Sequence, residues 1–214
     1  FKVLLNASAN GCSEMATALV TGIITMMFNW TMLHYIGEDG IAAVTIIMYV
    51  LMFASSLYTG YSYGVAPMIS YYYGECSREK LKKLTKISLI VILLISVITM
   101  TVSFILTKPL VSVFARPDNP VYDLAVTGNR ICTLALLFIG FNIFASGMFT
   151  ALSNGMVSAV LAFSRSFVLM LLMMIVLPLV LGVNGIWLAT PSAELMALCL
   201  SAFLFLKYRK RYGY

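Results

Sequence analysis

Four ionisable side chains lie within long apolar stretches of the sequence, where charged residues are otherwise rare. They are Glu14, Arg130, Arg165 and Glu194. A charge among apolar residues is costly, so such groups usually pair with one another, bind an ion or substrate, or relay protons. These four residues are therefore the first candidates for chemistry.

Three of the four charges are expected to meet. Counting a rise of about 1.5 Å per residue from the predicted helix ends places Arg130, Arg165 and Glu194 near the middle of an apolar layer about 30 Å thick. A very short turn at residues 182–183 joins the segments that carry Arg165 and Glu194, so these segments must be antiparallel neighbours. We predict a structural cluster of the three charges, with Arg165 as the first-choice partner of Glu194 and Arg130 as the second. Its role is open between a structural clamp and proton or substrate coupling.

Glu14 stands near the start of its predicted helix, a few residues after Asn10 and Gly11. A carboxylate is favoured there by the positive end of the helix dipole, with Ser13 helping to cap. A direct role in substrate or cation binding is the alternative.

Neutral oxygens for a cavity can come from polar side chains inside the apolar stretches: Asn29, Asn142, Asn154, Thr25, Thr45 and Ser146. Hydrogen bonds between helices are the other use of such groups. The candidates for substrate binding or cation coupling are Glu14, Asn29, Asn142, Arg165 and Glu194.

The sequence offers no set of residues for enzyme catalysis. Its single histidine, His34, lies beside Tyr35 at the end of an apolar stretch, and its four cysteines are scattered without a CxxC pair. Neither a nucleophile with its base nor a cluster of metal ligands can be assembled from these residues. We expect no enzyme activity, no metal site and no resident cofactor.

The composition is that of an integral membrane protein. Hydrophobic residues make up 61% of the chain, charged residues 10%, and the mean hydropathy is +0.97, well outside the range of soluble domains. The apolar stretches are 20 residues or longer, which favours spanning helices over barrel strands. The net charge of +6 comes mostly from one loop and the C-terminus, the usual pattern of cytoplasmic membrane flanks rather than of nucleic-acid binding.

We predict an all-α integral membrane fold with six transmembrane helices at residues 12–36, 41–73, 84–106, 121–152, 156–181 and 184–206. Ten Lys and Arg residues then fall on one side of the membrane (Lys2, five in 78–86 and four in 207–211) and two on the other (Lys108 and Arg116). The positive-inside rule makes both termini cytoplasmic. The chain divides into a cytoplasmic segment (1–11), a transmembrane lobe (12–206) and a basic cytoplasmic tail (207–214).

Small residues and prolines indicate where the helices pack or bend. Gly60 and Gly64 continue the four-residue spacing of Ser56, which predicts a seam where another helix packs closely. Pro67 removes a backbone donor and predicts a kink in the same helix. Pro191 lies within the last helix, where an ordinary kink and a bending point in a transport cycle are the two readings.

Five ordered motifs resemble one known family. They are NGCSEMATALVTGIITMMFN (10–29), GEDGIAAVTIIMY (37–49), GVAPMISYYYGE (64–75), FTALSNGMVSAVLAFSR (149–165) and LPLVLGVNGIWLATPSAE (177–194). Together they resemble the C-terminal six-helix lobe of bacterial multidrug and toxic compound extrusion (MATE) transporters. Members of that family have twelve helices in two such lobes around a central cavity. The resemblance, with Phe1 in place of a starting Met, implies that this chain is one lobe of a longer protein.

What the resemblance implies is secondary active efflux of cationic or amphipathic drugs, driven by inward movement of Na⁺ or H⁺ across the bacterial cytoplasmic membrane. The implied partners are the lipid bilayer, the missing N-terminal lobe and small-molecule drugs. A lipid-linked saccharide flippase of the same superfamily is the alternative, and it would need more cationic cavity residues than Arg130 and Arg165. Family members with an acidic cation site place carboxylates deeper in the first and fourth helices, whereas the fourth helix here has only Asn142 in its core. A cation site is therefore not carried over from the family.

Overall fold

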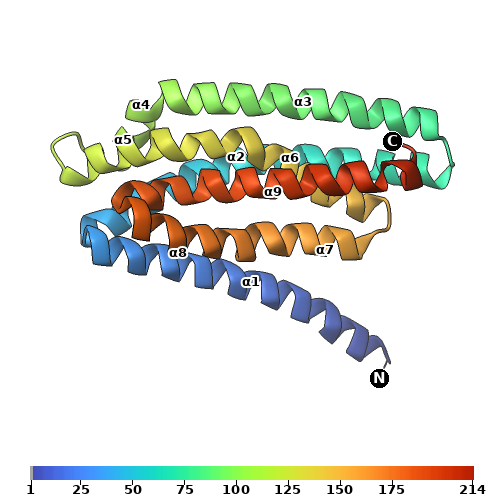
Figure 1. Ribbon diagram of the computed structural model, residues 1–214, viewed down its shortest axis with the longest axis horizontal. Helices are drawn as coiled ribbons and strands as arrows, with labels where there is room; N and C mark the ends of the chain where they lie inside the picture. The colour runs from blue at the N-terminus through green and yellow to red at the C-terminus, as the bar shows by residue number, and fades with distance from the viewer. Residues whose placement is uncertain (1) are drawn as a thin grey trace.

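The computed structural model describes residues 2–214, with side chains described from residue 19 onward. Every regular element in that range is helical, and the long helices lie side by side along the long axis of the molecule (Figure 1). The side chain of Glu14 lies outside the described residues, so both interpretations of that residue remain predictions.

The first three long helices are joined by short turns. They are α1 (Lys2–Tyr35), α2 (Glu38–Gly74) and α3 (Arg78–Ile105), and a short α4 (Thr107–Ser112) follows. Gly37 adopts a φ of 101° between α1 and α2, a conformation that favours glycine, and Glu38 and Asp39 then occupy the first turn of α2. In Figure 1, α1 lies at one edge of the bundle, where it packs against α2, α8 and α9.

The fourth predicted segment is one long stretch made of three elements: α5 (Pro120–Cys132), the 3₁₀ turn η1 (Thr133–Ala135) and α6 (Leu136–Ala151). Its start follows from the sequence, because Pro120 fits the first helical position and the Asn119 side chain accepts a hydrogen bond from the backbone N–H of Val121 at 2.9 Å. Asn154 caps the next helix in the same way, accepting from Val157 N–H at 3.4 Å.

The fifth predicted segment is also continuous but changes its winding in the middle. It consists of α7 (Gly155–Phe163), the π-helical segment η2 (Ser164–Leu169) and α8 (Met170–Leu181). A turn at Gly182, with a φ of +58°, leads into α9 (Val183–Tyr212). Gly185 contacts the backbone of Leu177, so α8 and α9 are close antiparallel neighbours as predicted.

Five helices among the residues with described side chains are long and apolar enough to cross a membrane: Glu38–Gly74, Arg78–Ile105, Pro120–Ala151, Gly155–Leu181 and Val183–Tyr212. They match the last five predicted segments to within a few residues at most of their ends. The remaining predicted segment, 12–36, lies within α1, and its crossing of the membrane remains a prediction.

The predicted packing seam at Gly60 and Gly64 is wrong. Both glycines are exposed, and a Cβ atom added at either would meet no other atom of the described residues within 4 Å. The face of α2 that is buried carries Ala54, Tyr58, Ser62, Val65 and Ile69 instead. Spacing identifies residues that share a face, but it does not show which face the neighbouring helices cover.

The close helix contacts occur at glycines of the fourth segment. A Cβ atom at Gly128 would lie 2.7 Å from Ile47 Cδ1 and 2.8 Å from the Trp187 ring. A Cβ atom at Gly140 would lie 2.7 Å from the Tyr58 ring. Trp187 and Tyr58 are among the largest fully buried side chains, so α5 and α6 approach α2 and α9 through these two glycines.

The two predicted hinge prolines lie inside uninterrupted helices. Pro67 is exposed within α2, and Pro191 is buried within α9. Bending at either residue remains a prediction.

The predicted tail, 207–214, continues α9 as far as Tyr212, and Gly213 then turns the chain with a φ of 77°. Tyr212 and Tyr214 are buried in a hydrophobic cluster that includes Phe149. The last residues are therefore packed onto the bundle.

Candidate functional site

A buried ion pair joins η2 to α9. Arg165 Nε donates hydrogen bonds to both carboxylate oxygens of Glu194, at 2.8 Å and 2.9 Å. The side chains are 22% and 11% exposed, so both charges are largely removed from the surface. The predicted pairing of Arg165 with Glu194 is confirmed.

Asn142 on α6 connects a third helix to this pair. Its side-chain amide donates to Glu194 Oε2 at 2.8 Å and to the backbone oxygen of Glu194 at 2.9 Å. Ser201 Oγ donates to Asn142 Oδ1 at 2.9 Å, which fixes the orientation of the amide. We call Arg165, Glu194, Asn142 and Ser201 the charge network.

Sequence reasoning singled out Asn142 but did not connect it to Glu194, and it missed Ser201. One signal was available for the serine. Ser201 follows Glu194 by seven residues, so the two side chains lie on the same face of α9, two turns apart.

Arg130 does not belong to the network, so this part of the predicted cluster is wrong. Its side chain is exposed, and its guanidinium lies over the Phe104 ring, 5.9 Å from the ring centroid. The residue of the same long segment that contacts Glu194 is Asn142, twelve positions later. Twelve residues span about 18 Å of helix, so Arg130 is too far along the segment to reach Glu194.

A cleft of about 840 Å³, lined by both apolar and hydroxyl-bearing side chains, borders the charge network. It lies between α2, α6 and the segment around η2, and Arg165 and Asn142 both line it. Hydroxyl groups dominate the remaining polar lining: Thr59, Ser62, Tyr63, Ser70, Ser146, Thr150 and Ser166. Ser62 is 4% exposed, and its hydroxyl has no hydrogen-bond partner among the described residues.

The other neutral candidates with described partners make hydrogen bonds within or between helices. Thr25 and Thr45 donate back to carbonyls of their own helices, and Ser146 shares hydrogen bonds with Ser158 on α7. Asn154 caps α7 and donates to the Tyr212 hydroxyl at 2.9 Å. Asn29 is partly exposed on α1, outside the charge network, and its predicted role remains a prediction.

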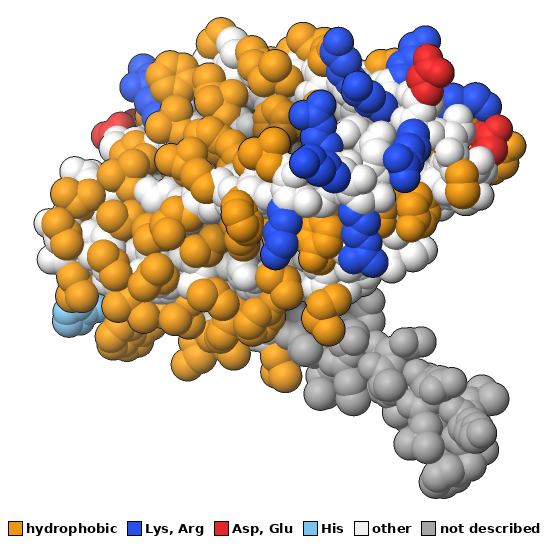
Figure 2. Space-filling view, turned by 45° about the vertical axis from the view of Figure 1, so that its right-hand side comes forward, with side chains coloured by type: hydrophobic (Ala, Val, Ile, Leu, Met, Phe, Trp, Pro, Cys, Tyr) orange, Lys and Arg blue, Asp and Glu red, His pale blue; other side chains and the backbone are white. Residues whose placement is uncertain are grey.

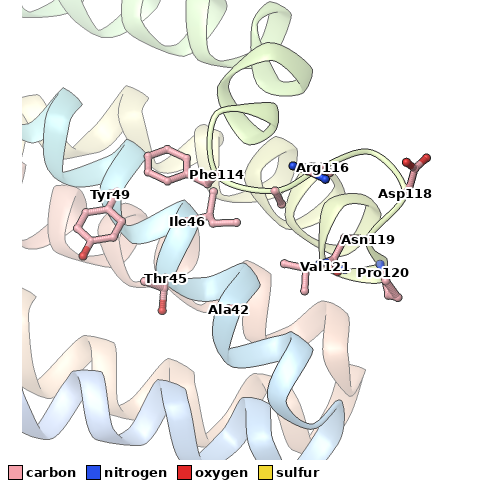
Figure 3. Close-up of a pocket in the computed structure, with 11 residues that line it drawn as sticks. Ala42, Thr45, Ile46, Tyr49, Phe114, Arg116, Asp118, Asn119, Pro120 and Val121 are labelled. Carbon is pink, nitrogen blue, oxygen red and sulfur yellow. Dashed lines mark hydrogen bonds between the residues drawn. The ribbon is translucent and has the colours of Figure 1, made fainter.

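A second cavity, of about 850 Å³, lies at the other end of the molecule, between the start of α2 and the loop before α5. Figure 3 shows the rings of Tyr49 and Phe114 next to each other on its wall, with centroids 6.0 Å apart. Its charged residues, Arg116 and Asp118, are exposed, and Asn119 is already used as a helix cap. This cavity lacks a buried charge and is the weaker candidate.

A helical bundle with five apolar helices long enough to span a bilayer, built around a buried ion pair, is a multi-pass membrane protein. Residues 15–176 match the family model MatE, and the chain belongs to this family of transporters.

Named relatives support the same assignment. The chain is 25% identical over 192 residues to the multidrug export protein MepA of Staphylococcus haemolyticus (strain JCSC1435), a match that covers 90% of this chain and 41% of the relative. The structure of a point mutant of the Vibrio cholerae MATE transporter VcmN has a TM-score of 0.83 at 16% identity, covering 92% of this chain and 44% of that chain. An outward-facing MATE family multidrug resistance transporter has a TM-score of 0.81 at 19% identity, covering 91% and 43%. The chain spans less than half the length of these relatives.

Proposed function

We propose that the chain is the C-terminal six-helix lobe of a MATE-type multidrug antiporter of the bacterial cytoplasmic membrane. Together with an N-terminal lobe, it would export cationic or amphipathic drugs in exchange for Na⁺ or H⁺. In this proposal α1 also crosses the membrane and brings the number of transmembrane helices from five to six. The family, the fold and the coverage of less than half of each relative support the assignment.

The charge network is the observation that carries the proposal. It lies within apolar helices at the wall of a cleft, and a buried ion pair is commonly no more stabilising than apolar side chains of the same volume. A purely structural clamp therefore explains its position poorly. We propose that Arg165, Glu194 and Asn142 couple ion movement to drug export.

The charge distribution supports cytoplasmic termini. Nine Lys and Arg residues lie at the end of the bundle formed by the start of α3 and the end of α9: Arg78, Lys80, Lys82, Lys83, Lys86, Lys207, Arg209, Lys210 and Arg211. A group of basic side chains on the right-hand side of Figure 2 marks this basic end. Only Lys108 and Arg116 lie at the opposite end of the described residues, so the positive-inside rule favours the basic end as the cytoplasmic one.

The flippase alternative has less support from the cleft. Arg165 is the one charged residue among the described residues that line it, and Glu194 already pairs with Arg165. A site for an anionic lipid-linked saccharide would require a clear excess of positive charge.

A dye-efflux assay on the protein encoded by the complete gene tests the proposal. Cells that lack their own efflux pumps should export a cationic dye when they express it, and collapse of the ion gradients should stop export. Glu194→Gln should reduce the efflux rate at least tenfold with normal membrane expression, whereas Glu79→Gln, at the exposed start of α3, should not. Efflux that persists without ion gradients, or that Glu194→Gln leaves intact, would contradict the proposal.

A further inference from the structure

Three lysines in the first turns of α3 are exposed and form no ion pair among the described residues: Lys82, Lys83 and Lys86. Their neighbour Lys80 pairs with Glu75, with Nζ 3.0 Å from Oε1. Glu79 is the one other acidic residue between positions 75 and 90, so a single carboxylate stands against three unpaired lysines and Arg78. The start of α3 therefore carries an excess of positive charge that the described residues do not neutralise.

The basic residues at the end of α9 are balanced by their own helix. Arg209, Lys210 and Arg211 lie in its last turn, where the negative end of the helix dipole favours positive charge. Arg78 and Lys80 instead lie in the first turn of α3, where the positive end of the dipole disfavours them. The excess charge of α3 thus needs a counter-charge from outside the protein.

Lys86 lies at the level where the basic end meets the apolar surface. Exposed apolar side chains begin at the next residue, Ile87. Lys86 is eight residues from the start of α3, about 12 Å of helix, whereas the exposed Tyr71 is three residues from the end of α2. Exposed tyrosines typically lie at the level of the lipid headgroups. Lys86 is therefore on the bilayer side of that level, where a lysine extends its ammonium group toward the headgroups.

The lysines continue into an apolar face of the same helix. Lys82 and Lys86 are four residues apart, so their side chains lie on one face of α3, one turn apart. Leu93 follows Lys86 by seven residues, lies on this face and is exposed. In Figure 1, α3 forms the edge of the bundle opposite α1, and Figure 2 shows the basic side chains next to a hydrophobic surface. A pair of cations and an apolar track thus follow one another along the outer face of α3.

We propose that Lys82 and Lys86 bind the phosphate of an anionic phospholipid whose acyl chain lies along the exposed apolar face of α3. Phosphate oxygens accept charge-assisted hydrogen bonds from lysine ammonium groups, and basic residues next to membrane helices attract anionic lipids. A lipid supplies both the phosphate and the apolar chain that this surface fits. An acidic segment of a soluble protein would leave the apolar residues beyond Lys86 uncovered.

The bound lipid would relieve the repulsion among the basic residues of α3 and so stabilise the start of this helix. This inference goes beyond the proposed function, and its tests need no transport. If the lipid site fails, the antiporter proposal is unaffected.

Thermal unfolding of the full chain in a neutral detergent, with phospholipid added in rising proportion, tests the site. Phosphatidylglycerol should raise the melting temperature by several degrees in a saturating manner. Phosphatidylcholine with the same acyl chains has no net charge, and inorganic phosphate has no acyl chain, so neither should produce this rise. An absent response to phosphatidylglycerol, or an equal response to either of the other two additions, would overturn the proposal.

Two double variants locate the response on the chain. Lys82→Gln/Lys86→Gln should need at least about tenfold more phosphatidylglycerol for the half-maximal rise, because each basic residue contributes to the attraction of an anionic lipid. Lys207→Gln/Lys210→Gln removes the same charge from the end of α9 and should respond as the wild-type chain does. All four lysines are exposed, so neither variant removes a packed side chain. Equal losses in the two variants would mean that net charge alone attracts the lipid, and the site would be wrong.

Fluorescence in vesicles tests where the acyl chain lies. Leu93→Trp reports on the proposed track, and Val102→Trp, at an exposed position near the other end of α3, is the control. After subtraction of the wild-type signal, phosphatidylglycerol with brominated chains should quench Leu93→Trp more strongly than brominated phosphatidylcholine at the same mole fraction. Val102→Trp should be quenched equally by both lipids.

The preference at Leu93→Trp should vanish when Lys82→Gln/Lys86→Gln is added. Equal quenching of Leu93→Trp by the two lipids, or a preference that survives the loss of both lysines, would contradict the proposal.

Discussion

Glu194 receives hydrogen bonds from Arg165 and Asn142, which lie on two other helical segments. Removing one of these partners should lower the free energy of unfolding. Arg165→Met leaves a buried carboxylate, and Glu194→Leu leaves a guanidinium that still borders the cleft. We expect each single variant to lower the free energy of unfolding by about 3 kcal/mol, and the double variant to lie within about 1 kcal/mol of wild type. Denaturant unfolding in detergent measures all four corners of this cycle. Strictly additive losses would mean that the two side chains do not interact.

The partner of Glu194 could be predicted from the sequence because a turn of two residues forces α9 and the helix before it to be neighbours. The same reasoning failed for Arg130. Depths were counted on the assumption that the segments of Arg130 and Glu194 begin at the same level, and the contact of Asn142 with Glu194 shows that they do not. Asn142 shows the size of the error, because it occupies the place that was expected for Arg130.

At the scale of helices, α5 and α6 depend on two glycines. A methyl group at Gly140 would collide with the fully buried Tyr58 ring, and one at Gly128 would collide with Ile47 and Trp187. We expect Gly140→Ala and Gly128→Ala each to lower the free energy of unfolding by about 1–3 kcal/mol.

Gly60→Ala and Gly64→Ala are the matched controls. They meet open space, and alanine is the better helix former, so they should be neutral or stabilising by about 0.5–1 kcal/mol. Denaturant unfolding of the four variants decides which helix face is packed. If Gly60→Ala lowered the free energy of unfolding as much as Gly140→Ala, the observed packing of α2 would be contradicted.

Apolar length, turn residues and caps were sufficient to place the long helices, because each of these signals is local. The rotation of a helix about its axis was not predictable for α2, since small residues occur on both its exposed and its buried face. The π-helical winding of η2 was not predictable either. Its sequence, SRSFVL, carries no residue that demands an extra residue per turn.

At the scale of the whole molecule, charge is divided unequally between the two ends. The basic end carries nine Lys and Arg residues against Glu75 and Glu79, whereas the opposite end carries two against Glu38, Asp39, Asp118 and Asp123.

The orientation of the lobe is open to a direct labelling test. Cys76 is exposed in the turn between α2 and α3, at the basic end, and Asp118 is exposed in the loop before α5, at the opposite end. Because a surplus of Lys and Arg retains a loop in the cytoplasm, we expect Cys76 to react with a membrane-impermeant maleimide only after the cells are permeabilised. Asp118→Cys, in a chain whose native cysteines are replaced by serine or alanine, should react in intact cells. The reverse pattern would place the basic end outside. Labelling of both positions in intact cells would mean that the chain inserts in two orientations, and that its charge asymmetry alone does not fix its topology.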